Sequence, residues 1–220
     1  MISARQLRAA GIVATVAALL GGTGDILLFS TPGFAADLFA VRVLPTWRIV
    51  TGTLLAIAVI PLMALGYWMF SRYLRRASQT LADAVFLGGI YGIGIGNAIH
   101  GTVGTLTQVV QRSGLTGAEP GFTATFARLV VPLYALFYVL MGVGSLVLAV
   151  IIWRGKTAYP RWAILLLPLW SNVLVLPLAQ IVPPLGDVLV PSIANLSHAL
   201  LFGVVTAYFW GREEEAASIR

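Results

Sequence analysis

The sequence predicts an all-α membrane protein, a bundle of six transmembrane helices that forms a single domain over residues 1–220. Two observations lead to this fold class. Hydrophobic residues make up 59% of the chain and charged residues only 10%, whereas a soluble domain of this length needs far more charge on its surface. The chain also holds six apolar runs of about 20 residues, the length that a helix needs to cross a bilayer.

The six runs follow one another with short connections. The third is longer than a perpendicular span requires, so a tilt or a protrusion is expected. The fifth is the shortest and holds Pro168 and Pro177, which predicts a kink. Pro183 and Pro184 predict its end. The predicted spans are residues 9–29, 49–70, 82–110, 129–153, 163–182 and 188–210.

The first span has an alternative interpretation as a signal peptide. Arg5 and Arg8 precede an apolar stretch, and small residues follow around Ala35 and Ala36. The apolar run is longer than an ordinary signal core, which favours a helix that stays in the protein.

Basic residues predict the topology. If both termini are cytoplasmic, ten basic residues lie on the cytoplasmic side and four on the other, as expected from the positive-inside rule. The net charge of +6 then reflects topology, so no nucleic-acid partner is expected. The predicted location is a cell membrane, interpreted as a bacterial cytoplasmic membrane. The four outer basic residues are Arg42, Arg48, Arg112 and Arg128.

Two outer connections are long. Residues 30–48 contain Phe34, Leu38 and Phe39 at the spacing of one helix face, which predicts a short interfacial segment in the first outer loop. Residues 111–128 are rich in Gly and Thr and suit a mobile flap. The alternative is that both are plain connectors.

Polar side chains inside the spans are costly in lipid and must find partners or water. The chain has two histidines, and each follows an asparagine by three residues: Asn97 with His100, and Asn195 with His198. Residues three apart share a helix face, so the two pairs are expected to meet antiparallel if their helices pack. Counting along the spans places this polar set around a cavity in the outer half of the bilayer.

These residues predict a small membrane enzyme that acts on a lipid-soluble or amphipathic substrate. His100 or His198 would act as general acid or base, because an imidazole titrates near working pH. Asp25 would orient a histidine or act as the partner acid. The remaining polar side chains of the spans would bind the substrate: Asn97, Asn172, Asn195, Gln180 and Ser197.

Other functions stay open. His100 and His198 are also suited to be the two axial ligands of a haem b. Three spans in each half, each half ending in an N-x-x-H pair, are compatible with a small transporter, and a structural membrane subunit is a further alternative. The absence of cysteine excludes thiol chemistry, and no metal site is predicted.

Structural roles are the alternative for each of these features. A neutral histidine bonded to a neighbouring helix is a common lock, and Asp25 lies near enough to the outer end of its span to reach water or Arg48. Gly88, Gly92 and Gly96 recur at four-residue spacing, which favours close helix packing over ligand contact.

Overall fold

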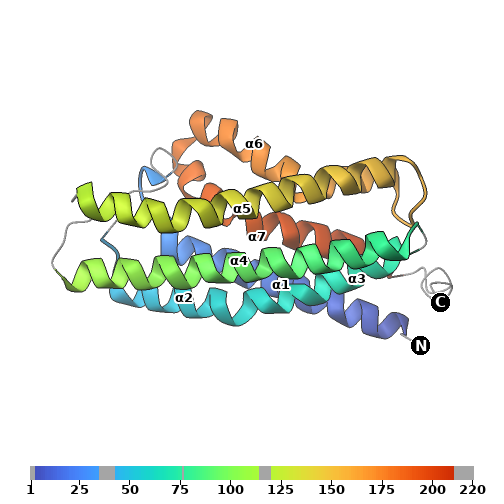
Figure 1. Ribbon diagram of the computed structural model, residues 1–220, viewed down its shortest axis with the longest axis horizontal. Coiled ribbons are helices and arrows are strands. Elements are labelled where there is room, and N and C mark those ends of the chain that lie inside the picture. The colour runs from blue at the N-terminus through green and yellow to red at the C-terminus, as the bar shows by residue number, and fades with distance from the viewer. Residues whose placement is uncertain (1–2, 35–42, 76, 114–119, 211–220) are drawn as a thin grey trace.

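The computed structural model describes residues 3–34, 43–75, 77–113 and 120–210, and no strand occurs within these ranges. The predicted all-helical class is therefore confirmed. The elements, shown in Figure 1, are α1 (Ala4–Phe29), α2 (Thr46–Val59), η2 (Ile60–Met63), α3 (Ala64–Leu74), α4 (Gln79–Arg112), α5 (Pro120–Trp153), η3 (Arg161–Leu166), α6 (Pro168–Ile181) and α7 (Pro183–Phe209).

Among the residues that the structure describes, five segments are long and apolar enough to cross a membrane, which is consistent with a membrane-embedded protein. They are α1, the run from α2 to α3, α4, most of α5, and α7. Helix α6 has only 14 residues. Six spans therefore remain a prediction, because the fifth predicted span contains this short helix.

Prolines explain the two broken spans. Leu167, between η3 and α6, has an extended backbone, since the ring of Pro168 disfavours a helical conformation at the residue before it. Pro61 turns the middle of the second span into η2, because it lacks an N–H and its ring crowds the preceding helical turn. The span predicted for residues 49–70 lies within the run Thr46–Leu74, but the turn inside it was not predicted.

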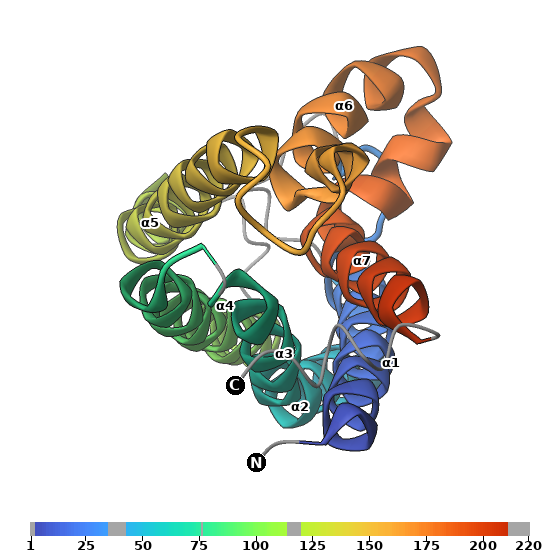
Figure 2. The ribbon, with the colours of Figure 1, turned by 90° about the vertical axis from the view of Figure 1, so that its right-hand side faces the viewer.

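The helices enclose a space between two groups. Helices α4 and α5 lie on one side, and α1 and α7 lie on the other (Figure 2). The α2–α3 run connects the groups, because α2 packs on α1 and α4 while α3 packs on α4 and α1. Helix α6 packs mainly on α7.

Helix α1 begins and α7 ends at the same end of the bundle (Figure 1). The Arg8 guanidinium lies 5.3 Å from the centre of the Trp210 ring and joins the two. We call this end the termini end. Its side of the membrane stays a prediction.

The two long connections that were predicted to lie on the outer side differ from expectation where they are described. Phe34 is buried and its ring lies 6.0 Å from that of Phe29, so it packs into the protein. Leu38 and Phe39, the rest of the predicted interfacial segment, lie outside the described residues. The flap predicted for residues 111–128 is wrong in part: α4 continues to Arg112 and α5 begins at Pro120.

Arg48 closes the end of α1. Its Nε donates to the Leu27 carbonyl at 3.0 Å, and its Nη2 donates to the carbonyls of Ile26 and Ser30 at 3.0 and 2.7 Å. Leu27 lies in the last helical turn and Ser30 is the C-cap, where intrahelical donors run out, while the Ile26 carbonyl also accepts from the Ser30 N–H. Arg48 is therefore the partner of this helix end and not of Asp25, the alternative that the sequence left open.

Replacing Arg48 with methionine is expected to destabilise the protein by roughly 3 kcal/mol, because buried carbonyls lose charged donors. Thermal unfolding in detergent would measure the loss. Arg48→Lys is the matched control: it keeps the charge but not the planar fork, so it should recover only part of the stability. Equal stability of wild type and Arg48→Met would contradict this role.

Candidate functional site

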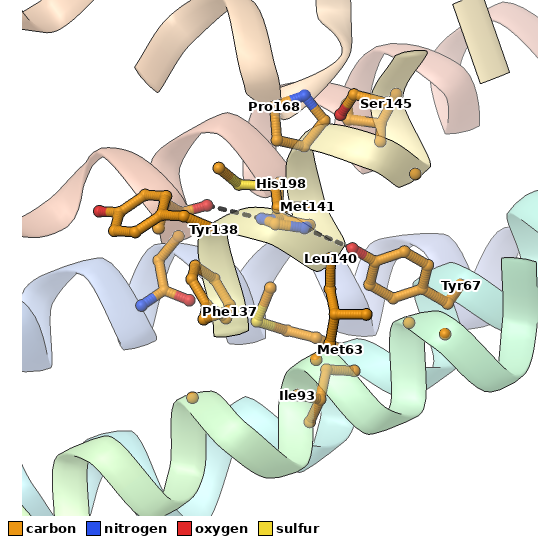
Figure 3. A pocket seen from close by; sticks show the side chains of 18 of the residues that line it. Met63, Tyr67, Ile93, Phe137, Tyr138, Leu140, Met141, Ser145, Pro168 and His198 are labelled. Atoms are coloured by element: carbon orange, nitrogen blue, oxygen red, sulfur yellow. Dashed lines mark hydrogen bonds between the residues drawn. The ribbon is translucent and has the colours of Figure 1, made fainter. Parts of the chain in front are cut away.

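A cavity of about 270 Å³ lies between the two groups of helices, and its wall is mostly apolar. Residues from α1, α3, α4, α5 and α7 line it, together with the start of α6. Asp25, His100, Asn195 and His198 are all in the wall. These four residues come from three of the predicted spans and share one cavity, part of which Figure 3 shows.

Asp25 joins three helices. One carboxylate oxygen lies 3.1 Å from Nε2 of His100 on α4, and the other accepts a 2.7 Å hydrogen bond from Nδ2 of Asn195 on α7. All three residues are at least nine-tenths buried. Gly21 makes room for this contact, since a Cβ there would lie 3.1 Å from the Asn195 amide carbon. The glycines before Asp25 thus let α7 approach closely enough for Asn195 to hold the carboxylate.

His100 is held by one nitrogen and free at the other. The Asp25 carboxylate is an acceptor, so the His100 Nε2 that faces it carries a hydrogen. Nδ1 is buried and has no hydrogen-bond partner. In the neutral ring Nδ1 therefore offers a lone pair, and leaving such a group unpaired is costly.

His198 has the opposite arrangement. Its Nδ1 lies 2.6 Å from the carbonyl oxygen of Ala194, which only accepts, so Nδ1 carries the hydrogen. Nε2 of the neutral ring then accepts the hydroxyl hydrogen of Tyr67, whose oxygen is 2.6 Å away (Figure 3). Both ring nitrogens of His198 are occupied within the protein.

The two N-x-x-H pairs do not meet as expected. Helices α4 and α7 are not among the closely packed pairs of described helices, so the condition for a direct antiparallel contact between the pairs is not met. Asn195 reaches Asp25 and not a histidine. Asn97 is half-buried, lies outside the cavity wall and has a buried Oδ1 without a partner. The histidines share the cavity but belong to separate hydrogen-bond networks.

Three of the predicted substrate-binding residues also lie outside the wall. Asn172 is buried and donates to the carbonyl of Pro168 at 2.8 Å. Ser197 donates to the Ala194 carbonyl at 2.8 Å within its own helix. Gln180 is exposed. Their predicted contact with a ligand has no support in this geometry.

The glycines of α4 line the cavity. Gly88, Gly92 and Gly96 are all in the wall, and a Cβ at Gly88 or Gly92 would meet no atom within 4 Å. Their predicted role in close helix packing is therefore wrong. We call these three residues the glycine stripe, and its effect is to leave space.

Sequence reasoning missed the aromatic side chains of the wall. Tyr67 comes from α3, and Tyr134, Phe137 and Tyr138 come from α5. A signal was present, because a tyrosine inside an apolar span needs a partner for its hydroxyl as much as a histidine needs one. Tyr67 meets that need with His198.

No cluster of three or more metal-ligating side chains of the His, Cys, Asp or Glu type occurs in the part of the chain that the structure describes. The two histidines and Asp25 are thus not gathered around one point. Haem ligation by both histidines stays a prediction. It would require the Tyr67 hydroxyl to leave Nε2 of His198.

The chain belongs to the family of unknown function DUF6796, whose sequence model matches residues 1–210. No curated protein and no solved structure matches the chain. The matched region covers every helix described above, so the cavity and its polar residues belong to the family domain.

Replacing Tyr67 with phenylalanine is expected to lower the stability by about 1–3 kcal/mol, because a buried imidazole acceptor loses its donor. Thermal unfolding in detergent would measure the change. Tyr138→Phe is the matched control in the same wall, since the Tyr138 side chain is 42% exposed. The His198–Tyr67 contact would be unimportant if both variants unfolded at the wild-type temperature.

Proposed function

We propose that this protein is a membrane enzyme that uses the Asp25–His100 pair for acid–base chemistry on a lipid-soluble substrate. One observation carries the proposal: Nδ1 of His100 is buried in the wall of a largely apolar cavity without a partner, while Nε2 is anchored to Asp25. An anchored imidazole with one free nitrogen is the arrangement of a general base.

Each residue of the cluster has a part in this chemistry. Nδ1 of His100 takes a proton from the substrate, and the ionised Asp25 stabilises the imidazolium that results. Asn195 holds the second oxygen of the carboxylate and so fixes its direction. The apolar wall excludes water, which strengthens these interactions.

His198 acts as a positioning residue in this proposal. Its Nε2 accepts the hydrogen of the Tyr67 hydroxyl, so the lone pairs of the Tyr67 oxygen point away from His198 and can accept a further hydrogen bond. A substrate hydroxyl or N–H in the cavity would find an acceptor there. The direct catalytic role predicted for His198 from sequence stays a prediction. Such a role would require one of its two ring nitrogens, both of which are hydrogen-bonded within the protein, to give up its partner.

The test uses deuterium exchange, since a base that removes a carbon-bound substrate proton lets solvent return a deuteron that the product retains. Chemistry at a hydroxyl is followed instead as conversion of the lipid. The full-length protein in nanodiscs is incubated in D₂O with a total lipid extract, and mass spectrometry follows deuterium uptake and lipid conversion. We expect a lipid that changes with wild type, and a loss of about 10²–10⁴ in rate with His100→Gln. No protein-dependent change in any lipid would overturn the proposal.

The absorption spectrum of the purified protein tests the haem alternative. The enzyme proposal expects no Soret band. A Soret band in the wild-type protein that disappears in both His100→Ala and His198→Ala would contradict the acid–base proposal and support haem binding.

We further propose six spans with both termini in the cytoplasm of a cell, with η3 and α6 together forming the fifth span. The common end of α1 and α7 and the ten-to-four distribution of basic residues support this topology. Reporter fusions at Gly155 and after Arg220 should both report a cytoplasmic position. An external position at either site would contradict the topology.

A further inference from the structure

The cavity is long and narrow. Its wall follows α4 from Leu81 to His100, which corresponds to about 28 Å along a helix axis. A cavity of about 270 Å³ that follows this length can hold an extended chain. The polar groups Asp25, His100 and Asn195 gather at the end of this wall that is farther from the termini end.

The glycine stripe provides the width. Any other residue at Gly88 or Gly92 would extend into the open space, since a Cβ there meets nothing within 4 Å. A second, independent observation comes from His100, which belongs to the same wall. The His100 side chain is 7% exposed and its Nδ1 has no partner within the protein.

The cavity opens between α4 and α5. Ala84 and Gly88 on α4 are in its wall and exposed, as is Val147 on α5 with 42% exposure. The surrounding surface is apolar: Leu87, Ile90 and Val143 are also exposed. An opening on such a surface admits a molecule from the lipid phase and not from water.

The free nitrogen selects the head group. Because His100 donates from Nε2 to Asp25, the neutral ring accepts at Nδ1, and it therefore binds a hydrogen-bond donor such as a hydroxyl. A carboxylate head would bring a second negative charge close to Asp25, and like charges disfavour each other strongly in an apolar site. An ester or an alkane has no hydrogen to donate.

We propose that the cavity binds an uncharged, single-chain amphiphile with a hydroxyl head. The chain lies along the glycine stripe after entering between α4 and α5, and the hydroxyl donates to Nδ1 of His100. This inference rests on the proposed function in that it names the substrate class of the same site.

The test measures binding of tritiated 1-hexadecanol to the full-length protein in nanodiscs by scintillation proximity. We expect saturable binding to wild type and a loss of about 10-fold or more with Gly92→Leu, which fills the chain site. Gly94→Leu is the matched control: Gly94 is on the same helix, is exposed outside the wall, and offers equal space to a Cβ. It should bind like wild type.

Competition tests the head group. Unlabelled hexadecanol should displace the probe, while hexadecanoate, methyl hexadecanoate and hexadecane should be about 10-fold weaker or worse. Equal displacement by hexadecane would overturn the hydroxyl assignment and indicate an ordinary acyl-chain site. Absence of saturable binding, or equal loss in Gly92→Leu and Gly94→Leu, would overturn the chain site.

These outcomes are separate from the fate of the proposed enzyme. If Gly92→Leu and Gly94→Leu differ in binding but no turnover depends on His100, the binding site is supported and the proposed enzymatic activity is contradicted. Turnover of a lipid that does not compete with hexadecanol keeps the enzyme and removes this substrate class.

Discussion

Asp25→Asn is expected to lower the rate of lipid conversion by about 10³–10⁴-fold, the loss that follows when the carboxylate of a catalytic Asp–His pair becomes an amide. The amide carries no negative charge to stabilise the imidazolium. Its NH₂ group, if turned to Nε2 of His100, also moves the ring hydrogen to Nδ1 and removes the base. The measurement is the rate of deuterium uptake or conversion in the wild-type assay.

Asn97→Ala is a control for the loss of a polar side chain on the same face of α4, outside the cavity wall. It should leave the conversion rate within a few-fold of wild type. The monodisperse elution of Asp25→Asn in detergent should match wild type, because the side chains have the same shape. Conversion by Asp25→Asn at the wild-type rate would show that the Asp25–His100 contact has no part in catalysis.

Gly52→Leu is expected to cause the largest loss of stability, about 3 kcal/mol or more, and to prevent recovery of folded protein. A Cβ at Gly52 would lie 2.8 Å from the Gly24 carbonyl oxygen and 3.0 Å from the Leu28 amide nitrogen. Both are backbone atoms, so α1 and α2 must separate. Asp25 follows Gly24 directly, and the separation would also disturb the Asp25–His100 contact.

The yield and unfolding temperature of purified protein measure this effect. Gly94→Leu is again the control, because it makes the same change where a Cβ meets nothing within 4 Å. It should retain the wild-type unfolding temperature. Equal behaviour of the two variants would show that the α1–α2 contact tolerates separation.

Much of the fold follows from the sequence because lipid permits few alternatives. A long apolar run in a bilayer must be helical to satisfy its own backbone, so the runs at residues 9–29 and 82–110 were placed to within a few residues. Pro168 indicated an interruption of the fifth span, and the break lies at Leu167. The interruption at Pro61 was missed, because the apolar pattern does not show how a helix resolves a missing hydrogen bond.

The candidate site followed from sequence only in part. The cost of a polar group in lipid identified Asp25, His100, Asn195 and His198, all of which line the cavity. The spacing of the N-x-x-H pairs suggested that they meet, but spacing fixes a face of one helix and does not fix which helix that face meets. The structure separates the two pairs into different networks.

The glycine stripe shows a second limit. Small residues at four-residue spacing allow either a close neighbour or an empty groove, and the sequence pattern is the same for both. At Gly52 the neighbour is present, whereas at Gly92 the space is open. The position of the neighbouring helix decides between them, α1 in the case of Gly52 and α5 in the case of Gly92.

The central claim is that Asp25 anchors His100 and leaves its Nδ1 free, and histidine tautomers test it directly. The chain has only two histidines, so selective ¹⁵N-histidine labelling gives four ring-nitrogen signals, assigned with His100→Gln and His198→Gln. The account predicts opposite neutral tautomers, with the hydrogen on Nε2 in His100 and on Nδ1 in His198. A hydrogen on Nδ1 of neutral His100 would contradict it.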